Sequence, residues 1–153
     1  NVVGMVPRFI ENFDLDFFLI ASPYTLLDQD ALDEELPMCA AHGASVVIGA
    51  VFSSGILATG AIPGALYAYQ PASEEILEKT RRIEAVCARH EVPLPAAALQ
   101  FPLAHPAVAS VIPGANSRAI VESNIDAVKH TISADFWAEL KQEGLLRADA
   151  PTP

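Results

Sequence analysis

Three apolar runs of strand length constrain the fold of this chain more than any other feature. They are Leu15–Ser22 (LDFFLIAS), Ser45–Phe52 (SVVIGAVF) and Val108–Ile112 (VASVI). None alternates cleanly between apolar and polar residues, which is typical of strands covered on both faces in a parallel sheet. Between the first two, Asp28–His42 has apolar residues at helical spacing, and Gly43 provides a stop. Strand and helix thus repeat with a period of about thirty residues, the length of one βα unit.

Further helices are expected along most of the remaining chain. Ser73 is an N-cap residue with Glu74 and Glu75 behind it, so we predict a long helix from there to His90. The other expected helices are Pro7–Asn12, Pro95–Leu103, Ser117–Lys129 and Ser133–Leu145. The segment Ser53–Gln70, rich in Gly, Ser, Ala and Pro, is predicted as a loop long enough to be functional.

Two architectures fit this order of elements: an open doubly wound sheet, or part of a (β/α)₈ barrel. Three strands make a small sheet for 153 residues, and a complete barrel needs about 250. Strands upstream of the first residue, which is not Met, would resolve the mismatch. A small Rossmann-type domain is disfavoured, because no GxGxxG motif follows a first strand.

Composition narrows the possible partners. The chain is 52% hydrophobic and 18% charged, with a mean hydropathy of +0.32, so we expect one core and some surface buried against more protein. Nine Lys+Arg against nineteen Asp+Glu give a net charge of −10, which disfavours nucleic-acid binding.

No apolar run approaches the roughly 20 residues of a membrane helix, and no secretion signal is evident. We expect an acidic cytoplasmic protein. Cys39 and Cys87, without CxxC spacing, are expected to be buried thiols.

The segment Val108–Asn124 reads as a strand, a Pro-Gly turn and the start of an amphipathic helix. Backbone N–H groups at such a helix start favour phosphate. Two plainer interpretations stay open: Gly114 supplies the positive φ of an ordinary turn, and SSGILATG is a flexible linker. The four histidines are scattered without metal-ligand spacing. We predict no metal site, and we find no catalytic acid and base.

Three segments in register resemble one family. They are DLDFFLIASPYTLLDQDAL, HGASVVIGAVFSSGILATG and VASVIPGANSRAIVESNI, and they are similar to the C-terminal half of the aldo-keto reductase superfamily, in the branch of bacterial aldose 1-dehydrogenases and pyridoxal dehydrogenases. The resemblance implies an α/β fold, the C-terminal half of a (β/α)₈ TIM barrel with parallel strands alternating with helices. Residues 1–153 would form one partial domain that contains the last strands.

The resemblance also implies residues that bind a nicotinamide cofactor. Asn1 stands where the family has an Asn that holds the nicotinamide carboxamide. The stretch SSGILATG matches the part that cradles the pyrophosphate, and the IPG turn matches the part that holds the adenosine phosphate. The implied pyrophosphate residues are Ser53, Ser54, Gly55 and Leu57, and those of the turn are Pro113, Gly114, Ala115 and Asn116. Asn124 matches an Asn that contacts the adenine.

Departures from the family pattern bear on the cofactor. Many members have Lys and Arg where this chain has Gly114 and Ile120, and those cations hold the 2′-phosphate of NADP. Since a dianionic phosphate needs cationic partners and only Arg118 is near, we expect NAD to be preferred over NADP. The Tyr that often stacks on nicotinamide aligns with Gly49, and Phe52 is an alternative aromatic face.

The largest departure concerns catalysis. The Asp, Tyr, Lys and His tetrad of the family comes from the first four strands, so none of it is assigned to residues 1–153. We therefore expect the cofactor-binding half of an oxidoreductase acting on an aldose or similar alcohol or aldehyde, inactive alone, whose partner is the N-terminal half of the barrel. The alternative is a non-catalytic half-barrel that persists as a homodimer or a partner-bound subunit.

Overall fold

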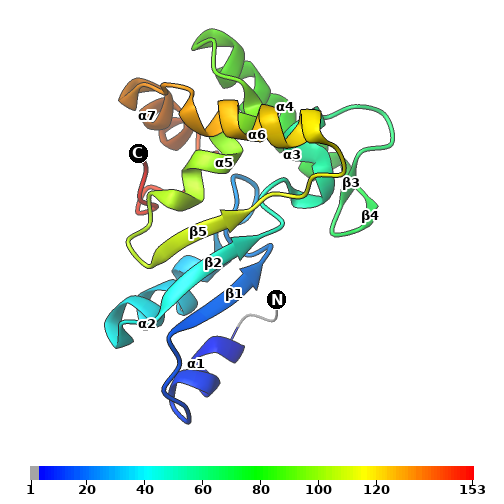
Figure 1. Ribbon diagram of the computed structural model, residues 1–153. Coiled ribbons are helices and arrows are strands. Elements are labelled where there is room, and N and C mark those ends of the chain that lie inside the picture. Colours follow the sequence, from blue (N-terminus) through cyan, green and yellow to red (C-terminus); the bar gives the residue numbers. More distant parts are fainter. Residues whose placement is uncertain (1–3) are drawn as a thin grey trace.

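The central sheet has three parallel strands in the order β1–β2–β5 (Figure 1). β1 is Phe17–Ala21, β2 is Ser45–Gly49 and β5 is Val108–Ile112, in a computed structural model that describes residues 4–153. The last residue of β1 pairs with the last of β2, which pairs with the last of β5, so the carboxyl ends lie side by side. β5 has the predicted bounds, whereas β1 is shorter than predicted at both ends and β2 at its carboxyl end.

Helices precede, separate and follow the strands. They are α1 (Met5–Ile10), α2 (Glu35–His42), α3 (Ile56–Thr59), α4 (Glu74–Arg89), α5 (Leu94–Leu103), α6 (Arg118–Lys129) and α7 (Ala134–Gln142). Three of them begin at a serine, as predicted: the hydroxyls of Ser73, Ser117 and Ser133 each accept the backbone N–H three residues further on. These bonds satisfy donors that a helix start leaves without a partner.

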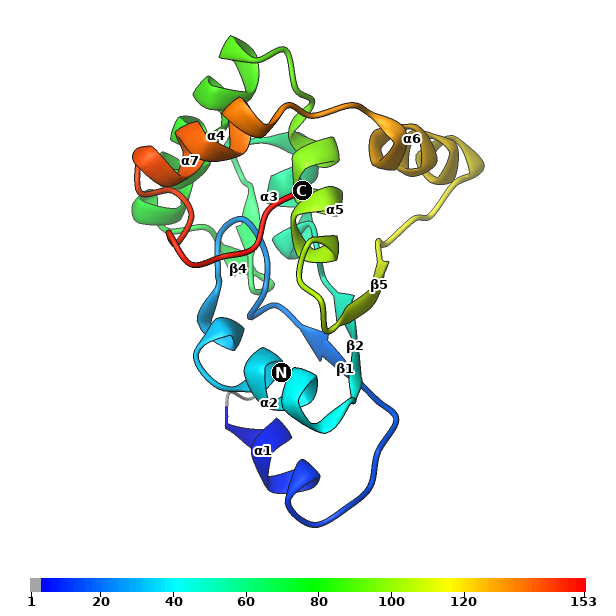
Figure 2. The same cartoon turned by 90° about the vertical axis from the view of Figure 1, so that its left-hand side faces the viewer.

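The core lies between the sheet and the helices on one of its faces, where Figure 2 shows α2 and α5 on the same side. Ile20 of β1 and Ile48 of β2 are buried there. Trp137 on α7 is also buried in this core. Cys39 and Cys87 are buried free thiols, as predicted. Burying large apolar side chains of this kind contributes about 1.5–3 kcal/mol each.

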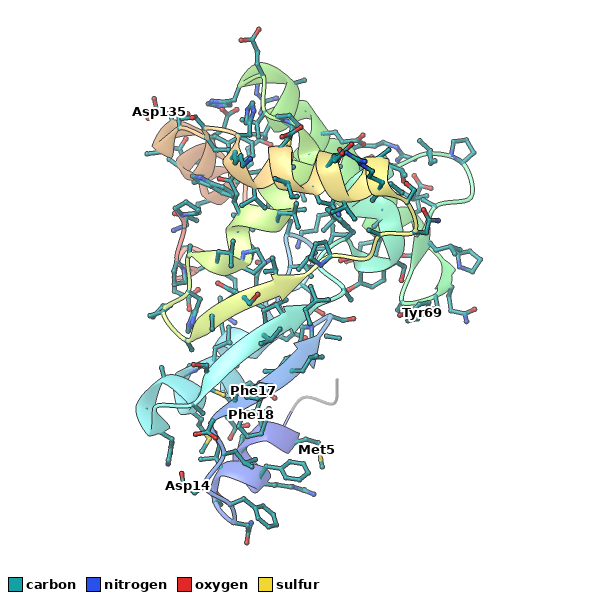
Figure 3. The ribbon with its side chains drawn as sticks, in the orientation of Figure 1. Met5, Asp14, Phe17, Phe18, Tyr69 and Asp135 are labelled. Carbon is teal, nitrogen blue, oxygen red and sulfur yellow. The ribbon has the colours of Figure 1, made fainter. Side chains whose placement is uncertain are left out.

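The opposite face of the sheet is largely uncovered in this chain. Phe17 and Leu19 on β1 are 61% and 56% exposed, and Ile112 on β5 is 51% exposed. Figure 3 labels Phe17 beside Phe18, whose side chain packs against the core; successive strand residues point to opposite faces. The prediction of strands covered on both faces is therefore wrong for this chain. Both faces are apolar, but its own helices cover only one.

The segment predicted as one helix over Asp28–His42 is divided. It begins as a 3₁₀ turn, η1 (Asp30–Leu32), and becomes α-helical only from Glu35. The Asp28 carboxylate accepts the backbone N–H of Asp30 at 3.0 Å, a local bond that competes with helix formation. Gly43 ends the helix in the left-handed region, with φ +72°, as predicted.

The segment Ser53–Gln70, predicted as a loop, is ordered into short elements. It holds a 3₁₀ turn, η2 (Ser53–Gly55), then α3, and then β3 (Leu66–Tyr67), which forms a hairpin with β4 (Gln70–Pro71). Within residues 4–153, no helix is long and apolar enough to cross a membrane. The same residues contain no group of three or more His, Cys, Asp or Glu side chains placed to hold a metal ion.

Candidate functional site

The segments that follow β1, β2 and β5 leave the same edge of the sheet, because the strands are parallel and end in register. Ligands of parallel α/β proteins bind at this carboxyl edge. A pocket of about 520 Å³ lies between the segment after β2 and the turn and helix after β5. Among the predicted site residues, its lining includes Ser53, Ser54, Gly55, Gly114 and Asn124. The fold thus brings together residues that are about sixty positions apart in the sequence.

The backbone after β2 makes the tight turn that forms one wall of this pocket. Ser53, Ser54 and Gly55 have φ values of +47°, +61° and +103°. Positive φ is uncommon for serine, and such strain clusters at functional sites. The turn is held by the Ser53 N–H, which donates to the Ala50 carbonyl at 2.8 Å, and by the Gly55 N–H, which donates to the Phe52 carbonyl at 2.9 Å.

The two serine hydroxyls of the turn differ in what they can offer a ligand. The Ser53 hydroxyl is buried and is hydrogen-bonded to the Thr25 hydroxyl, with the two oxygens 3.2 Å apart, so it is held within the scaffold. The Ser54 hydroxyl is half-buried and accepts the Tyr69 N–H at 3.0 Å. Since an accepting hydroxyl keeps its own proton, and no acceptor for that proton is recorded among the described residues, Ser54 is the serine that can donate into the pocket.

Leu57 does not line the pocket, although the family resemblance places it in the pyrophosphate cradle. Its side chain is fully buried in the core, and its N–H donates to the Phe52 carbonyl at 3.1 Å. Leu57 therefore anchors α3 from the inside and leaves contact with a ligand to the turn that precedes it.

Tyr69, at the tip of the β3–β4 hairpin, is a pocket residue that the sequence did not reveal. Figure 3 shows its side chain projecting from the hairpin, and it is 83% exposed. Ala68 and Tyr69 both have positive φ, +49° and +62°, the geometry of a two-residue hairpin turn that normally has Asn or Gly. Because neither residue is of that kind, no turn signal marked this hairpin.

The turn after β5 forms the opposite wall. Gly114 lines the pocket, and its φ lies outside the left-handed region. A Cβ built on Gly114 meets nothing within 4 Å. The interpretation of Gly114 as a glycine required by positive φ is therefore wrong. Asn124, half-buried on α6, faces the same pocket one helical turn beyond Ile120.

The remaining predicted residues are not gathered in this pocket. Pro113 and Ala115 line a neighbouring apolar groove between β5 and α6, of about 370 Å³, and Asn124 borders both spaces. Asn116 is exposed and lines neither. Asn1 lies outside the described residues.

The charges near the β5 turn face away from the pocket. Ile120 lines the pocket, whereas Arg118 and Glu122, two positions to either side, lie on the opposite side of the helix. The Arg118 side chain is 91% exposed, and its Nε donates to the Glu122 carboxylate at 2.7 Å. The one cation near the turn in the described chain is thus paired and turned outward.

Comparison with known proteins gives the family. A sequence model described as Aldo/keto reductase family matches residues 8–143. The chain belongs to this family. Among curated relatives of this aldo/keto reductase, D-threo-aldose 1-dehydrogenase of a Pseudomonas species is 40% identical over 153 residues, covering 99% of this chain and 45% of the relative. Pyridoxal 4-dehydrogenase of Microbacterium luteolum is 40% identical over 137 residues, covering 90% of this chain and 40% of the relative.

The fold agrees with a partial aldo/keto reductase barrel. The holo form of aldo-keto reductase AKR11C1 from Bacillus halodurans superposes with a TM-score of 0.69 at 25% identity, covering 95% of this chain and 48% of that one. Its apo form has the same TM-score at 24% identity. This chain therefore spans less than half the length of each of these relatives. The expectation of an α/β fold with parallel strands and helices of the aldo-keto reductase type is confirmed.

The chemistry available in the pocket of this aldo/keto reductase chain is that of binding. Its described lining contains serine and threonine hydroxyls, one amide and several apolar side chains, and its one titratable group is the Tyr69 phenol. General acid–base catalysis needs a proton donor and acceptor at the reacting group. Tyr24 and His105 do not supply them here, because both are buried: the Tyr24 ring packs against Phe101, and the His105 ring packs against Tyr24.

Proposed function

We propose that this chain is the cofactor-binding part of a nicotinamide-dependent aldo-keto reductase. The observation that carries the proposal is the single pocket shared by the turn after β2 and the turn after β5. It joins the two segments whose sequences match the pyrophosphate and adenosine-phosphate sites of the family. Neither segment alone forms a concave site, and their meeting at the carboxyl edge of the sheet provides one.

The pocket has the polar and apolar groups that a dinucleotide requires. The free Ser54 proton is suited to an anionic diphosphate, and the Asn124 amide can both donate to and accept from a purine edge. Phe52 and Ile120 provide apolar walls for rings. When bound, the nicotinamide ring accepts or delivers a hydride. The role of these residues is to hold the cofactor in a fixed place, because orientation of the reactants is a large part of the rate.

The proton-transfer groups of the reaction are proposed to lie outside this chain, in the N-terminal half of a (β/α)₈ barrel. Residues 1–153 would then be one partial domain that completes the barrel, and the isolated chain would be inactive. Phe17, Leu19 and Ile112 lie on the uncovered face of the sheet. They would line the interior of the barrel once further strands pair with β1 and β5. The intact enzyme is proposed to be cytoplasmic.

The substrate class is proposed to be an aldose or a similar alcohol or aldehyde. The support is that two relatives at 40% identity are named for such substrates, D-threo-aldose and pyridoxal. NAD is proposed as the preferred cofactor and NADP as the weaker one. Gly114 and Ile120 carry no charge at the pocket, and Arg118 is paired outside it, so a 2′-phosphate finds no cation.

The test is cofactor binding to the polypeptide as its gene encodes it, with fluorescence titration of NADH and NADPH. We expect both nucleotides to bind saturably, with NADH binding more tightly than NADPH. We also expect the polypeptide to oxidise an aldose, or a similar alcohol or aldehyde, with NAD⁺. A parallel preparation of residues 1–153 alone should show no turnover. Failure of the encoded polypeptide to bind either nucleotide would refute the proposal.

The second candidate is a non-catalytic half-barrel that acts as a homodimer or as a subunit bound to another protein. The observation that favours it is the uncovered apolar sheet face, together with the open outer edges of β1 and β5. Analytical ultracentrifugation of residues 1–153 distinguishes the two. A discrete dimer without NADH affinity favours the non-catalytic half-barrel. Aggregation favours the first candidate, in which these residues are part of a longer enzyme.

A further inference from the structure

A carboxylate on α4 contacts the backbone just after α3, the short helix that follows the pocket turn Ser53–Gly55. Glu84 is half-buried, and its Oε2 accepts the backbone N–H of Ala61 at 3.2 Å. Ala61 follows directly after Gly60, where α3 ends. Glu84 is 23 residues away in sequence and belongs to a different helix. The contact therefore joins α4 to the segment that carries the pocket serines.

Gly60 is shaped by this contact. Its φ is +83° with ψ −175°, a conformation that L residues rarely adopt. A Cβ built on Gly60 would lie 2.1 Å from Oε1 of Glu84. The close approach of the carboxylate thus depends on glycine at this position, both for the backbone angle and for the space.

The path from Glu84 to the pocket is short and stiff. α3 has four residues, Ile56–Thr59, between Gly55 at the pocket and Gly60 at the carboxylate. Ile56 and Leu57 of this helix are buried in the core. On the other side, α4 is fixed by its buried residues Thr80, Ile83, Val86 and Cys87. A long, well-packed helix therefore holds one end of α3, and the pocket turn is at the other end.

We propose that Glu84 is a positioning residue for cofactor binding, whose carboxylate holds the end of α3 so that Ser54 and Gly55 keep their places in the pocket. This inference rests on the proposed function. Glu84 does not itself line the pocket. Its effect on the ligand passes through α3: without the anchor, the turn adopts its binding geometry for a smaller fraction of the time, and apparent affinity falls by that fraction.

The experiment measures NADH binding and steady-state kinetics on the encoded polypeptide with three substitutions of one residue. Glu84→Ala removes the acceptor, Glu84→Asp keeps the charge but shortens its reach, and Glu84→Gln keeps an acceptor oxygen at full length. The loss of one hydrogen bond corresponds to about a two- to tenfold change in an equilibrium constant. We expect Glu84→Ala and Glu84→Asp to raise the NADH Kd and the cofactor KM by that factor, with kcat at saturating cofactor unchanged. Glu84→Gln should restore wild-type binding.

The matched control is Glu78→Ala, on the same helix. Glu78 accepts from the exposed Arg81 at 3.1 Å, and no recorded hydrogen bond joins it to the pocket turn. We expect it to leave the NADH Kd unchanged. Hydrogen exchange of peptides spanning residues 53–62 should become faster in Glu84→Ala and stay at the wild-type rate in Glu78→Ala.

Several other results for the Glu84 variants would contradict the positioning role. Wild-type affinity in both Glu84→Ala and Glu84→Asp overturns the positioning role while leaving the proposed function intact. A joint loss of kcat and thermal stability in Glu84→Asp, without rescue by Glu84→Gln, shows a purely structural residue and overturns it as well. If Glu84→Ala does not fold, Glu84→Asp and Glu84→Gln still decide the matter. Absence of NADH binding in the wild-type protein removes the proposed function and this inference together.

Discussion

The hydroxyl groups of Ser53 and Thr25 are hydrogen-bonded in the buried interior, with their oxygens 3.2 Å apart. This bond joins the segment after β1 to the segment after β2, 28 residues apart. Thr25 Oγ1 also accepts the backbone N–H groups of Leu27 and Asp28, each at 3.2 Å. The side chain of one predicted site residue is therefore part of the scaffold, whereas its neighbour Ser54 lines the pocket with a hydroxyl that can still donate.

The two adjacent serines should consequently respond to alanine in opposite ways. Ser53→Ala should lower the free energy of unfolding by about 1 kcal/mol, the value of one net hydrogen bond, with little effect on NADH binding. Ser54→Ala should lower stability less, because the Tyr69 N–H that loses its acceptor is exposed and can bond to water. It should raise the NADH Kd about tenfold or more, since hydrogen bonds to charged groups contribute about 1.5–3 kcal/mol. Urea unfolding and NADH titration of both variants check this. A larger binding defect in Ser53→Ala would assign the anion contact to Ser53 instead.

Local patterns in the sequence account for much of the fold. The apolar run Val108–Ile112 predicted β5 with its correct bounds, and Ser73 predicted the start of α4. In both cases the signal lies within a few residues: an apolar run of strand length in the first, and a hydroxyl that caps the next turn in the second. Five predicted residues that line the pocket were identified through the family resemblance: Ser53, Ser54, Gly55, Gly114 and Asn124.

The contacts that the sequence could not reveal are hydrogen bonds between residues that are far apart in the sequence. Nothing near Glu84 indicates that it binds Ala61, and nothing near Ser53 indicates that its hydroxyl is hydrogen-bonded to Thr25. Tyr69 was missed for a different reason: its positive φ occurs without the glycine or asparagine that signals a tight hairpin. Long-range polar contacts and strained non-glycine turns leave no periodic trace in a single sequence.

The buried Tyr24 hydroxyl provides a second pair of contrasting variants. Tyr24 is fully buried, its ring packs against Phe101 with centroids 5.0 Å apart, and its hydroxyl has no partner among the described residues. Burial raises the pKa of this phenol, and the charge of Asp149 adds to the effect. A buried polar group without a partner costs about 1–3 kcal/mol. Tyr24→Phe keeps the ring contacts and should therefore raise the free energy of unfolding by about 1 kcal/mol.

Thr25→Val is the control for that variant at the next position. It removes a hydroxyl that takes part in three hydrogen bonds and should lower the free energy of unfolding by about 2 kcal/mol. Chemical denaturation of both proteins gives the comparison. If Tyr24→Phe destabilises as much as Thr25→Val, the Tyr24 hydroxyl is hydrogen-bonded in solution and the prediction is wrong.

His105 should make stability depend on pH in the mildly acidic range. It is 7% exposed, and its Nδ1 accepts the Ala107 N–H at 3.2 Å, which requires the neutral ring. Burial lowers the pKa of His105 below its ordinary value of 6.5. Because the folded pKa is the lower one, its contribution to stability is complete above pH 6.5. That contribution is lost as the pH falls from 6.5 through the folded pKa.

His105→Asn should remove this pH dependence, because the Asn side-chain oxygen can accept the same N–H without titrating. Urea midpoints measured between pH 7.5 and pH 5 should fall less in His105→Asn than in the wild type. Equal slopes in the two proteins would show that protonation of His105 does not oppose folding.

Cofactor preference should change when cations are placed at the pocket. Gly114 has ordinary φ and open space around its Cβ position, so lysine fits there without strain, and Ile120 faces the same pocket. The double substitution Gly114→Lys and Ile120→Arg gives a 2′-phosphate two charged partners, each hydrogen bond contributing about 1.5–3 kcal/mol. We expect the NADPH affinity to rise about tenfold or more relative to NADH.

The control Arg118→Ala should leave the ratio of NADPH affinity to NADH affinity unchanged, because Arg118 is paired with Glu122 on the outer side of α6. Fluorescence titration of the encoded polypeptide with both nucleotides measures the ratio. If it does not rise in the double variant, the absence of cations is not what disfavours NADP. If it falls in Arg118→Ala, Arg118 reaches the phosphate from the outer side of the helix.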